Sequence, residues 1–182
     1  PGLDIVGARG VPTPTAGEEK RPGARAVDGE GLGRVAALAK PLGISLAPWT
    51  RDPQGIYFGG NEMLMTPRQM IAFGELYLRR GRVSGQQIVP EAWVDTSCVP
   101  RTASRFDPDR LYGYGWWTRE IGGVTTCFAW GFGGQYIFVF RDLDLVIAAT
   151  SSTTVSDERR GYRQRLLDAN EEHVVRPLED YR

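Results

Sequence analysis

Residues that could act as nucleophiles or general bases are few in this chain and lie far apart. It has 182 residues, with one histidine, His173, and two cysteines, Cys98 and Cys127. A Ser-His-Asp triad or a cysteine nucleophile would need His173 as its base. That histidine follows two glutamates in a predicted C-terminal helix, which is typical of an exposed position. No G-x-S-x-G nucleophile elbow is present either. The sequence therefore predicts no self-contained catalytic triad.

The two cysteines could form one disulfide bond, but we favour two buried thiols. Cys127 lies in an apolar, strand-like segment, where a free cysteine behaves as a small core residue. A structural zinc site usually needs four Cys or His ligands, so we expect no metal site. We expect no cofactor. The redox compartment, and with it the cellular location, stays undetermined.

The segment 128–140 combines small residues with bulky aromatic ones. Its small residues are Ala129, Gly131, Gly133 and Gly134, and an apolar strand-like stretch follows at once. Glycine is unfavourable inside a strand, so several of them indicate close approach by a ligand or by another backbone. The segment leads into a strand and not into a helix, which argues against a phosphate loop. We interpret it as part of an antiparallel sheet that lines a cleft.

The elements that would position this segment can be located from local signals. Thr66 as N-cap, a proline at the first helical position and Gln69 predict a helix over 67–80 that stops at Gly81. A Gly-Gly pair predicts a tight hairpin turn. We expect further helices at 90–97 and from 157 to about 176, strands at 112–121, 124–130, 136–140 and 145–150, and a polar loop at 101–110. The fold class is therefore α+β, an antiparallel sheet of three to four C-terminal strands with packed helices.

The composition limits the classes of partner. The formal net charge is zero, which argues against a nucleic-acid surface. No segment is apolar over the length needed to cross a bilayer, and no signal peptide is visible, although the chain begins at Pro1 and not at Met. Residues 1–33 are rich in glycine and proline and predict a flexible segment, followed by one domain at 34–182.

Four separated blocks resemble the C-terminal half of the serine β-lactamase-like family. They are residues 59–77, 85–93, 112–117 and the glycine-aromatic run 128–140, in this order. The family includes class C β-lactamases, penicillin-binding-protein-related esterases and 6-aminohexanoate-dimer hydrolases. The resemblance covers about residues 41–176 and leaves 1–33 unmatched. It implies a partial β-lactamase/penicillin-binding-protein-like fold.

Two of the family's three catalytic motifs are not found in the chain. The first, Ser-x-x-Lys, would supply the nucleophile and its base. The chain has two lysines, Lys20 and Lys40, and each is preceded three residues earlier by Gly17 or Ala37. For the second motif, Tyr-x-Asn, the segment starting at Tyr57 has the wrong third residue. We therefore expect the chain to be inactive by itself.

Ala129, Trp130 and Gly131 lie where the family's third motif, Lys-Thr-Gly or His-Thr-Gly, should be. The resemblance implies that the backbone N–H of Phe132 would contribute to the oxyanion hole, and that the three motif residues and Gln135 would bind substrate. Both the motif's cation and its hydroxyl are replaced. An ester or a small linear amide is therefore a better expected substrate than a penicillin.

Two functional hypotheses follow. In the first, the chain is the C-terminal portion of a serine hydrolase that acts on ester or amide bonds, and the nucleophile comes from a missing N-terminal half. In the second, it is a non-catalytic binding or interaction module derived from that family. Whether residues 1–33 are native or the product of a frameshift stays open, and so does the oligomeric state.

Overall fold

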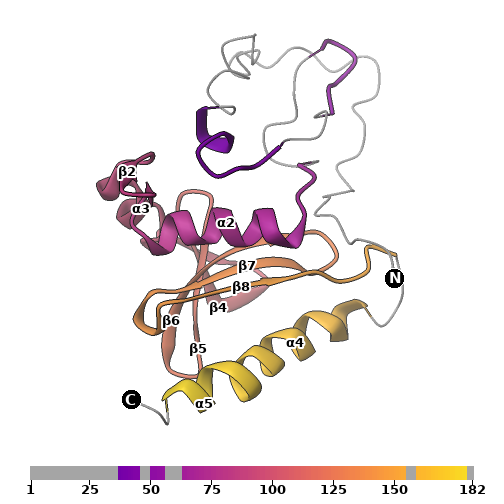
Figure 1. Ribbon diagram of the computed structural model, residues 1–182. Coiled ribbons are helices and arrows are strands. Elements are labelled where there is room, and N and C mark those ends of the chain that lie inside the picture. Colours follow the sequence, from indigo (N-terminus) through magenta and orange to yellow (C-terminus); the bar gives the residue numbers. More distant parts are fainter. Residues whose placement is uncertain (1–36, 46–49, 56–62, 155–158, 180–182) are drawn as a thin grey trace.

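A six-stranded antiparallel sheet forms the centre of the protein (Figure 1). The computed structural model describes residues 37–45, 50–55, 63–154 and 159–179. The strands follow one another in chain order across the sheet. They are β3 (Thr102–Ser104), β4 (Asp107–Tyr112), β5 (Trp117–Ile121), β6 (Val124–Gly131), β7 (Gln135–Phe140) and β8 (Leu145–Ala149). A separate two-stranded hairpin joins β1 (Arg82–Val83) to β2 (Gln86–Gln87).

Tight turns set the register of the long central strands. Gly122 and Gly123 have φ values of +59° and +83°, and they join β5 to β6 so that Ile121 pairs with Val124. Two successive residues with positive φ are what a two-residue hairpin turn requires, and glycine adopts them without steric cost. A 3₁₀ turn, Arg141–Leu143, joins β7 to β8. The predicted hairpin turn is confirmed.

The helix α2 (Pro67–Leu78) covers one face of the sheet and packs over β7 and β8 (Figure 1). It begins where the sequence predicts. The Gln69 N–H donates to Thr66 Oγ1 at 3.3 Å, and the Thr66 N–H donates to Gln69 Oε1 at 2.8 Å. This reciprocal capping box satisfies two N–H groups that have no partner within the helix. Met70 and Ile137 share an apolar cluster between the helix and the sheet.

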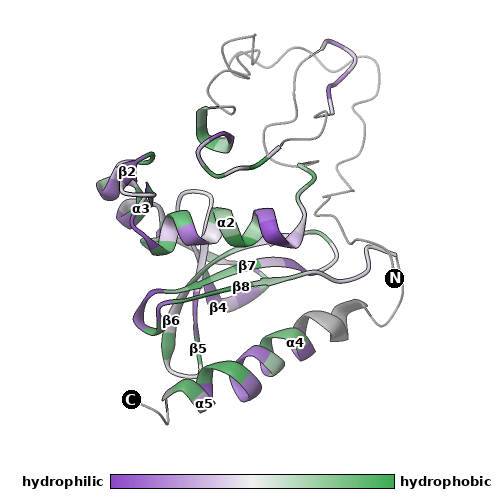
Figure 2. Cartoon of the chain, in the orientation of Figure 1, coloured by the Kyte–Doolittle hydropathy of each residue, from purple (hydrophilic) through white to green (hydrophobic). Residues whose placement is uncertain are grey.

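The opposite face is covered by the C-terminal helical segment (Figure 1). It consists of α4 (Arg159–Asn170), a π-helical turn (Glu171–Val175) and α5 (Arg176–Glu179). Leu167 and Val175 of this segment pack in one cluster with Phe128 and Phe138 of the sheet. The sheet therefore lies between two helical layers, and Figure 2 shows the apolar character of β7 and β8 between them.

Three expectations about the fold need correction. The segment 101–110 is not a loop, because it contributes β3 and most of β4, so the sheet is larger than the three to four strands we expect. The strand expected at 112–121 is interrupted, since residues 113–116 form the connection between β4 and β5. The last helix is divided by its π-helical turn. The antiparallel α+β class itself is confirmed. The flexible segment expected at 1–33 lies outside the described residues, and so does Tyr57.

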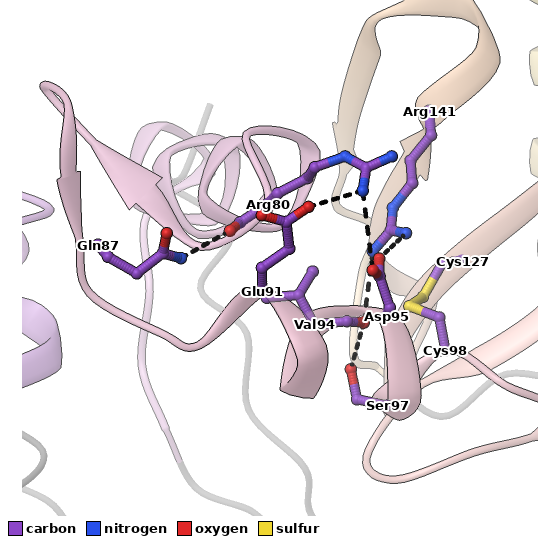
Figure 3. Close-up of polar contacts among 9 residues, drawn as sticks. All are labelled: Arg80, Gln87, Glu91, Val94, Asp95, Ser97, Cys98, Cys127 and Arg141. Carbon is purple, nitrogen blue, oxygen red and sulfur yellow. Dashed lines mark hydrogen bonds and ion pairs between the residues drawn. A yellow bond between two sulfur atoms is a disulfide. The ribbon is translucent and has the colours of Figure 1, made fainter.

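The cysteine prediction is also wrong, because Cys98 and Cys127 form a disulfide bond (Figure 3). Cys98 is the C-cap of α3 (Glu91–Ser97), and Cys127 lies in the middle of β6. The two residues are 29 positions apart in sequence, but their Cα atoms are 5.9 Å apart. Cys127 is buried, as expected of a core residue. The bond ties α3 to the face of the sheet that α2 covers.

Candidate functional site

The residues expected to form the site meet at one end of the β6–β7 hairpin. Ala129, Trp130 and Gly131 are the last residues of β6, and Gln135 is the first residue of β7, directly opposite Gly131. Phe132 lies in the turn between them and is half-buried. The structure therefore brings all five residues together. Their roles in substrate binding and oxyanion stabilisation stay predictions.

The turn after β6 depends on two glycines and on a close neighbouring segment. Gly133 and Gly134 have φ values of +81° and +91°. A Cβ atom on Gly134 would lie 2.5 Å from Ser151 Oγ, and one on Gly133 would lie 3.1 Å from the Thr153 backbone. Any larger residue would be strained in conformation and crowded by this contact. The close approach that the glycines predict is thus confirmed, and the approaching group is the segment that follows β8.

Hydrogen bonds hold the turn against this segment. Ser151 Oγ donates to the carbonyl of Gly133 and also lies 3.3 Å from that of Gly134. The side-chain amide of Gln135 donates to the Ser151 carbonyl at 2.6 Å. Gln135 is 1% exposed, so this contact is shielded from water. Ser151 and Gln135 therefore fix the path of the chain on both sides of the turn.

Trp130 lies on the other face of β6 from Ala129 and Gly131. Its ring stacks on Tyr136 with a centroid distance of 6.4 Å and meets Trp117 edge-on at 6.2 Å. The guanidinium carbon of Arg110 lies 4.5 Å from the Trp130 ring and 4.7 Å from that of Trp117. Trp130 is 37% exposed, so its ring both packs in the sheet and presents a surface to solvent.

Arg110 is a member of the site region that the sequence does not reveal. It is 3% exposed, although it lies in the segment expected to be a polar loop. One of its terminal nitrogens donates to Ser104 Oγ at 2.9 Å. A cation held against aromatic faces and shielded from water gains electrostatic stabilisation from the rings. The only signal in the sequence is that Arg110 lies two residues before Tyr112, because alternate residues of a strand share one face. Tyr112 pairs with Trp117, so Arg110 lies on the aromatic face of the sheet.

A polar network joins α3 to the end of β7 that lies away from the β6–β7 turn (Figure 3). Arg141, just after β7, donates to Asp95 Oδ1 at 2.7 Å and to the Val94 carbonyl at 3.3 Å. Arg80, just after α2, pairs with Glu91 at 2.8 Å and with Asp95 at 3.7 Å. The hydrogen bond to Glu91 and the nearby charge of Asp95 raise the pKa of Arg80. Helix α3 is thus joined to α2, to β7 and, through the disulfide, to β6.

Three other features of the described residues bear on the predictions from the sequence. His173 is exposed in the π-helical turn, as expected of a surface residue. Among the described residues, no group of three or more His, Cys, Asp or Glu side chains could hold a metal ion. In the same residues, no helix is both long and apolar enough to cross a membrane.

Comparison with solved structures places this arrangement in a known class of fold. A Bacillus anthracis protein named as a candidate 6-aminohexanoate-dimer hydrolase matches 70% of the chain, with a TM-score of 0.54 and 22% sequence identity. The chain spans 34% of that protein's length. A candidate β-lactamase from Bacteroides dorei matches with a TM-score of 0.46 and 15% identity, over 74% of this chain and 50% of its own. The first of these matches shows a fold shared with the Bacillus anthracis protein.

The family follows from the sequence match. The model of the β-lactamase family matches residues 6–171, and the chain belongs to this family. The family model matches the chain from residue 6 onward, so it includes most of residues 1–33. The expectation that these residues lie outside the resemblance to the family is therefore corrected. No curated protein matches the chain.

Proposed function

We propose that this chain is the C-terminal portion of a serine hydrolase that cleaves ester or amide bonds. The observation that supports the proposal is the β6–β7 turn, which Ser151 and Gln135 hold in place. It follows Ala129, Trp130 and Gly131, the residues expected at the position of the family's third motif. In the intact enzyme, the N–H of Phe132 and that of the nucleophilic serine would stabilise the oxyanion. A single such donor can contribute about 3–4 kcal/mol to transition-state stabilisation.

The third-motif position favours an uncharged substrate over one with a carboxylate. Ala129 and Trp130 offer no cation and no hydroxyl there, and the nearby Arg110 is 3% exposed with its guanidinium against two rings. A buried cation engaged in this way is poorly placed to bind a solvated carboxylate. An ester or a small linear amide with an apolar acyl group would suit the exposed part of the Trp130 ring.

The proposal assigns the nucleophile to sequence outside this chain, which contains no Ser-x-x-Lys. Incubating the chain with a fluorophosphonate probe should give no labelled serine and no hydrolysis of aryl esters. A longer product of the same gene that carries Ser-x-x-Lys should be labelled at that serine and should hydrolyse the esters. Labelling of any serine in the present chain would contradict the proposal, and so would an unreactive longer product.

The alternative is a non-catalytic binding module, and the partly exposed Trp130 ring is the observation that favours it. A saturable change in tryptophan fluorescence on addition of an uncharged aryl ester, lost in Trp130→Ala, would show binding by the chain alone. If the longer gene product also fails to react with the fluorophosphonate, the binding module becomes the better account. Ester hydrolysis by the longer product would exclude it.

A further inference from the structure

A hydrogen bond inside the β6–β7 turn orients the peptide group that carries the proposed oxyanion donor. The Gly134 N–H donates to the Gly131 carbonyl at 3.4 Å and closes the turn. That carbonyl and the Phe132 N–H belong to one peptide group, which is planar and, in this turn, trans. The C=O and N–H bonds of a trans peptide group point in opposite directions, so the direction of one fixes that of the other. The Gly134 N–H therefore helps to determine where the Phe132 N–H points.

The Gly134 N–H belongs to a peptide group that Ser151 holds from the other side. Ser151 Oγ donates to the Gly133 carbonyl, which lies in the same planar group as the Gly134 N–H. The Ser151 hydroxyl and the two peptide groups thus form a hydrogen-bond series, in which each group donates to the next. This series begins at the Ser151 hydroxyl and leads to the Phe132 N–H.

Hydrogen bonds in such a series polarise one another. A carbonyl that accepts a hydrogen bond makes the N–H of its own peptide group a stronger donor, and the gain is about 10–30% per bond. The Ser151 hydroxyl therefore strengthens the Gly134 N–H, which in turn strengthens the Phe132 N–H. An oxyanion is stabilised by donors that are already aimed at the place where its charge develops. The series supplies both the direction and the added strength.

Ser151 is itself held in place at the start of the series. Its carbonyl accepts a hydrogen bond from the side-chain amide of Gln135 at 2.6 Å, and Gln135 is 1% exposed. A Cβ atom on Gly134 would lie 2.5 Å from Ser151 Oγ, so a larger residue there would displace the hydroxyl. The glycine at 134 therefore leaves the space that the hydroxyl of Ser151 needs to reach the turn.

We propose that Ser151 is a positioning residue for the Phe132 N–H and acts on it through the hydrogen-bond series. This rests on the proposed function, in which the Phe132 N–H stabilises the oxyanion. Ser151 orients and polarises that donor through two peptide groups and does not itself react with the substrate. A fluorophosphonate should accordingly leave Ser151 unlabelled.

NMR spectroscopy of the present chain tests the hydrogen-bond series without any hydrolysis. We expect Ser151→Ala to move the amide proton signals of Gly134 and Phe132 upfield, because both N–H groups become less polarised. Ser151→Thr keeps the hydroxyl and should restore both signals. Ser152→Ala is the matched control, because Ser152 Oγ accepts from the Thr154 N–H at 3.2 Å, within the segment itself. A Phe132 signal that does not respond to Ser151→Ala would overturn the inference.

Kinetics of the longer gene product that carries Ser-x-x-Lys test the positioning role. We expect Ser151→Ala to lower kcat for an aryl ester about ten-fold with KM changed less than about two-fold, whereas loss of a whole oxyanion donor costs about 10²–10³ in kcat. Ser151→Thr should recover most of the lost kcat, and Ser152→Ala should keep the wild-type value. Each kcat is referred to the number of sites that a fluorophosphonate labels, so that unfolded protein is not counted.

The outcomes separate this inference from the proposed function. If the wild-type product hydrolyses the ester and Ser151→Ala is equally fast, the inference alone is wrong. A rise in KM at constant kcat would also overturn it, because Ser151 would then act in substrate binding. If the wild-type product does not hydrolyse the ester at all, the proposed function fails, and the role of Ser151 in catalysis fails with it.

Discussion

The two faces of the sheet are stabilised by different chemistry. On the α2 face the strands contribute aliphatic side chains such as Ile137 and Val139, and aromatic rings come from outside the strands, from Phe73, Tyr77 and Trp116. This face also contains the disulfide, and Gly74 lies so near the sheet that a Cβ atom there would lie 2.5 Å from Val146 Cγ1. The other face is aromatic, with Phe128, Tyr136 and Phe138 in successive ring contacts. The α2 face therefore combines close backbone approach with rings from outside the strands, and the other face depends on large aromatic side chains of the strands themselves.

The third-motif segment divides between these two faces. Ala129 packs with the two clusters on the α2 face, and the ring of Trp130 packs with the aromatic rings on the opposite face. A change on either face could therefore reach the β6–β7 turn, but through different contacts. Measuring the two faces separately shows which one controls the stability of the candidate site.

The largest effect is expected at the centre of the aromatic face. Phe138 is fully buried, and its ring lies 4.9 Å from that of Tyr136 and 5.7 Å from that of Phe128. We expect Phe138→Ala to lower the free energy of unfolding by about 3–5 kcal/mol, measured by urea denaturation. Val139→Ala, on the α2 face of the same strand, removes fewer atoms and should cost less. A larger loss at Val139 would reverse the order of the two faces.

Reduction of the disulfide tests the α2 face next. A cross-link between residues 29 positions apart restricts the unfolded chain, and its loss should lower the free energy of unfolding by about 2–4 kcal/mol. Thermal unfolding with and without a thiol reductant measures this. The double variant Cys98→Ser/Cys127→Ser should be as unstable as the reduced protein and should not respond to the reductant. No change on reduction would mean that the bond contributes nothing to stability.

Glycine-to-alanine substitutions in the two covering helices should have opposite signs. In Gly74→Ala, the new methyl group would overlap Val146 and Ile137, and overpacking of this kind costs about 1–3 kcal/mol. In Gly161→Ala of α4, the nearest atom is Arg165 Nη1 at 3.5 Å, so the helix should gain about 0.5–1 kcal/mol. Urea denaturation of both variants checks this. A stable Gly74→Ala protein would show that α2 can move away from the sheet.

The parts of the fold that depend on local chemistry could be predicted from the sequence. The capping box at Thr66 and the Gly122-Gly123 hairpin require only neighbouring residues, and both form as expected. The close approach of another segment just after β6 could also be predicted, because Gly133 and Gly134 leave no room for a side chain there.

Contacts between distant segments could not be predicted in the same way. The disulfide forms because the end of α3 folds onto β6, which no local pattern records. The segment 101–110 has a polar composition, but Arg110 is buried by two tryptophan rings from β5 and β6. Ser151 was missed for a similar reason, since its contact with the β6–β7 turn requires β8 to be in place.

The smallest expected effect is the coupling free energy between Arg110 and Trp130. It tests whether the partly exposed Trp130 ring on the aromatic face depends on the buried cation. A double-mutant cycle with Arg110→Met and Trp130→Ala should give a coupling of about 0.5–1 kcal/mol from the cation–ring contact at 4.5 Å. The hydrogen bond to Ser104 is lost in both arms that alter Arg110, so it cancels. Arg101→Met is the matched control, because that arginine lies over Tyr114 and should not couple to Trp130. Zero coupling at Arg110 would mean that the position of the exposed Trp130 ring does not depend on the buried cation.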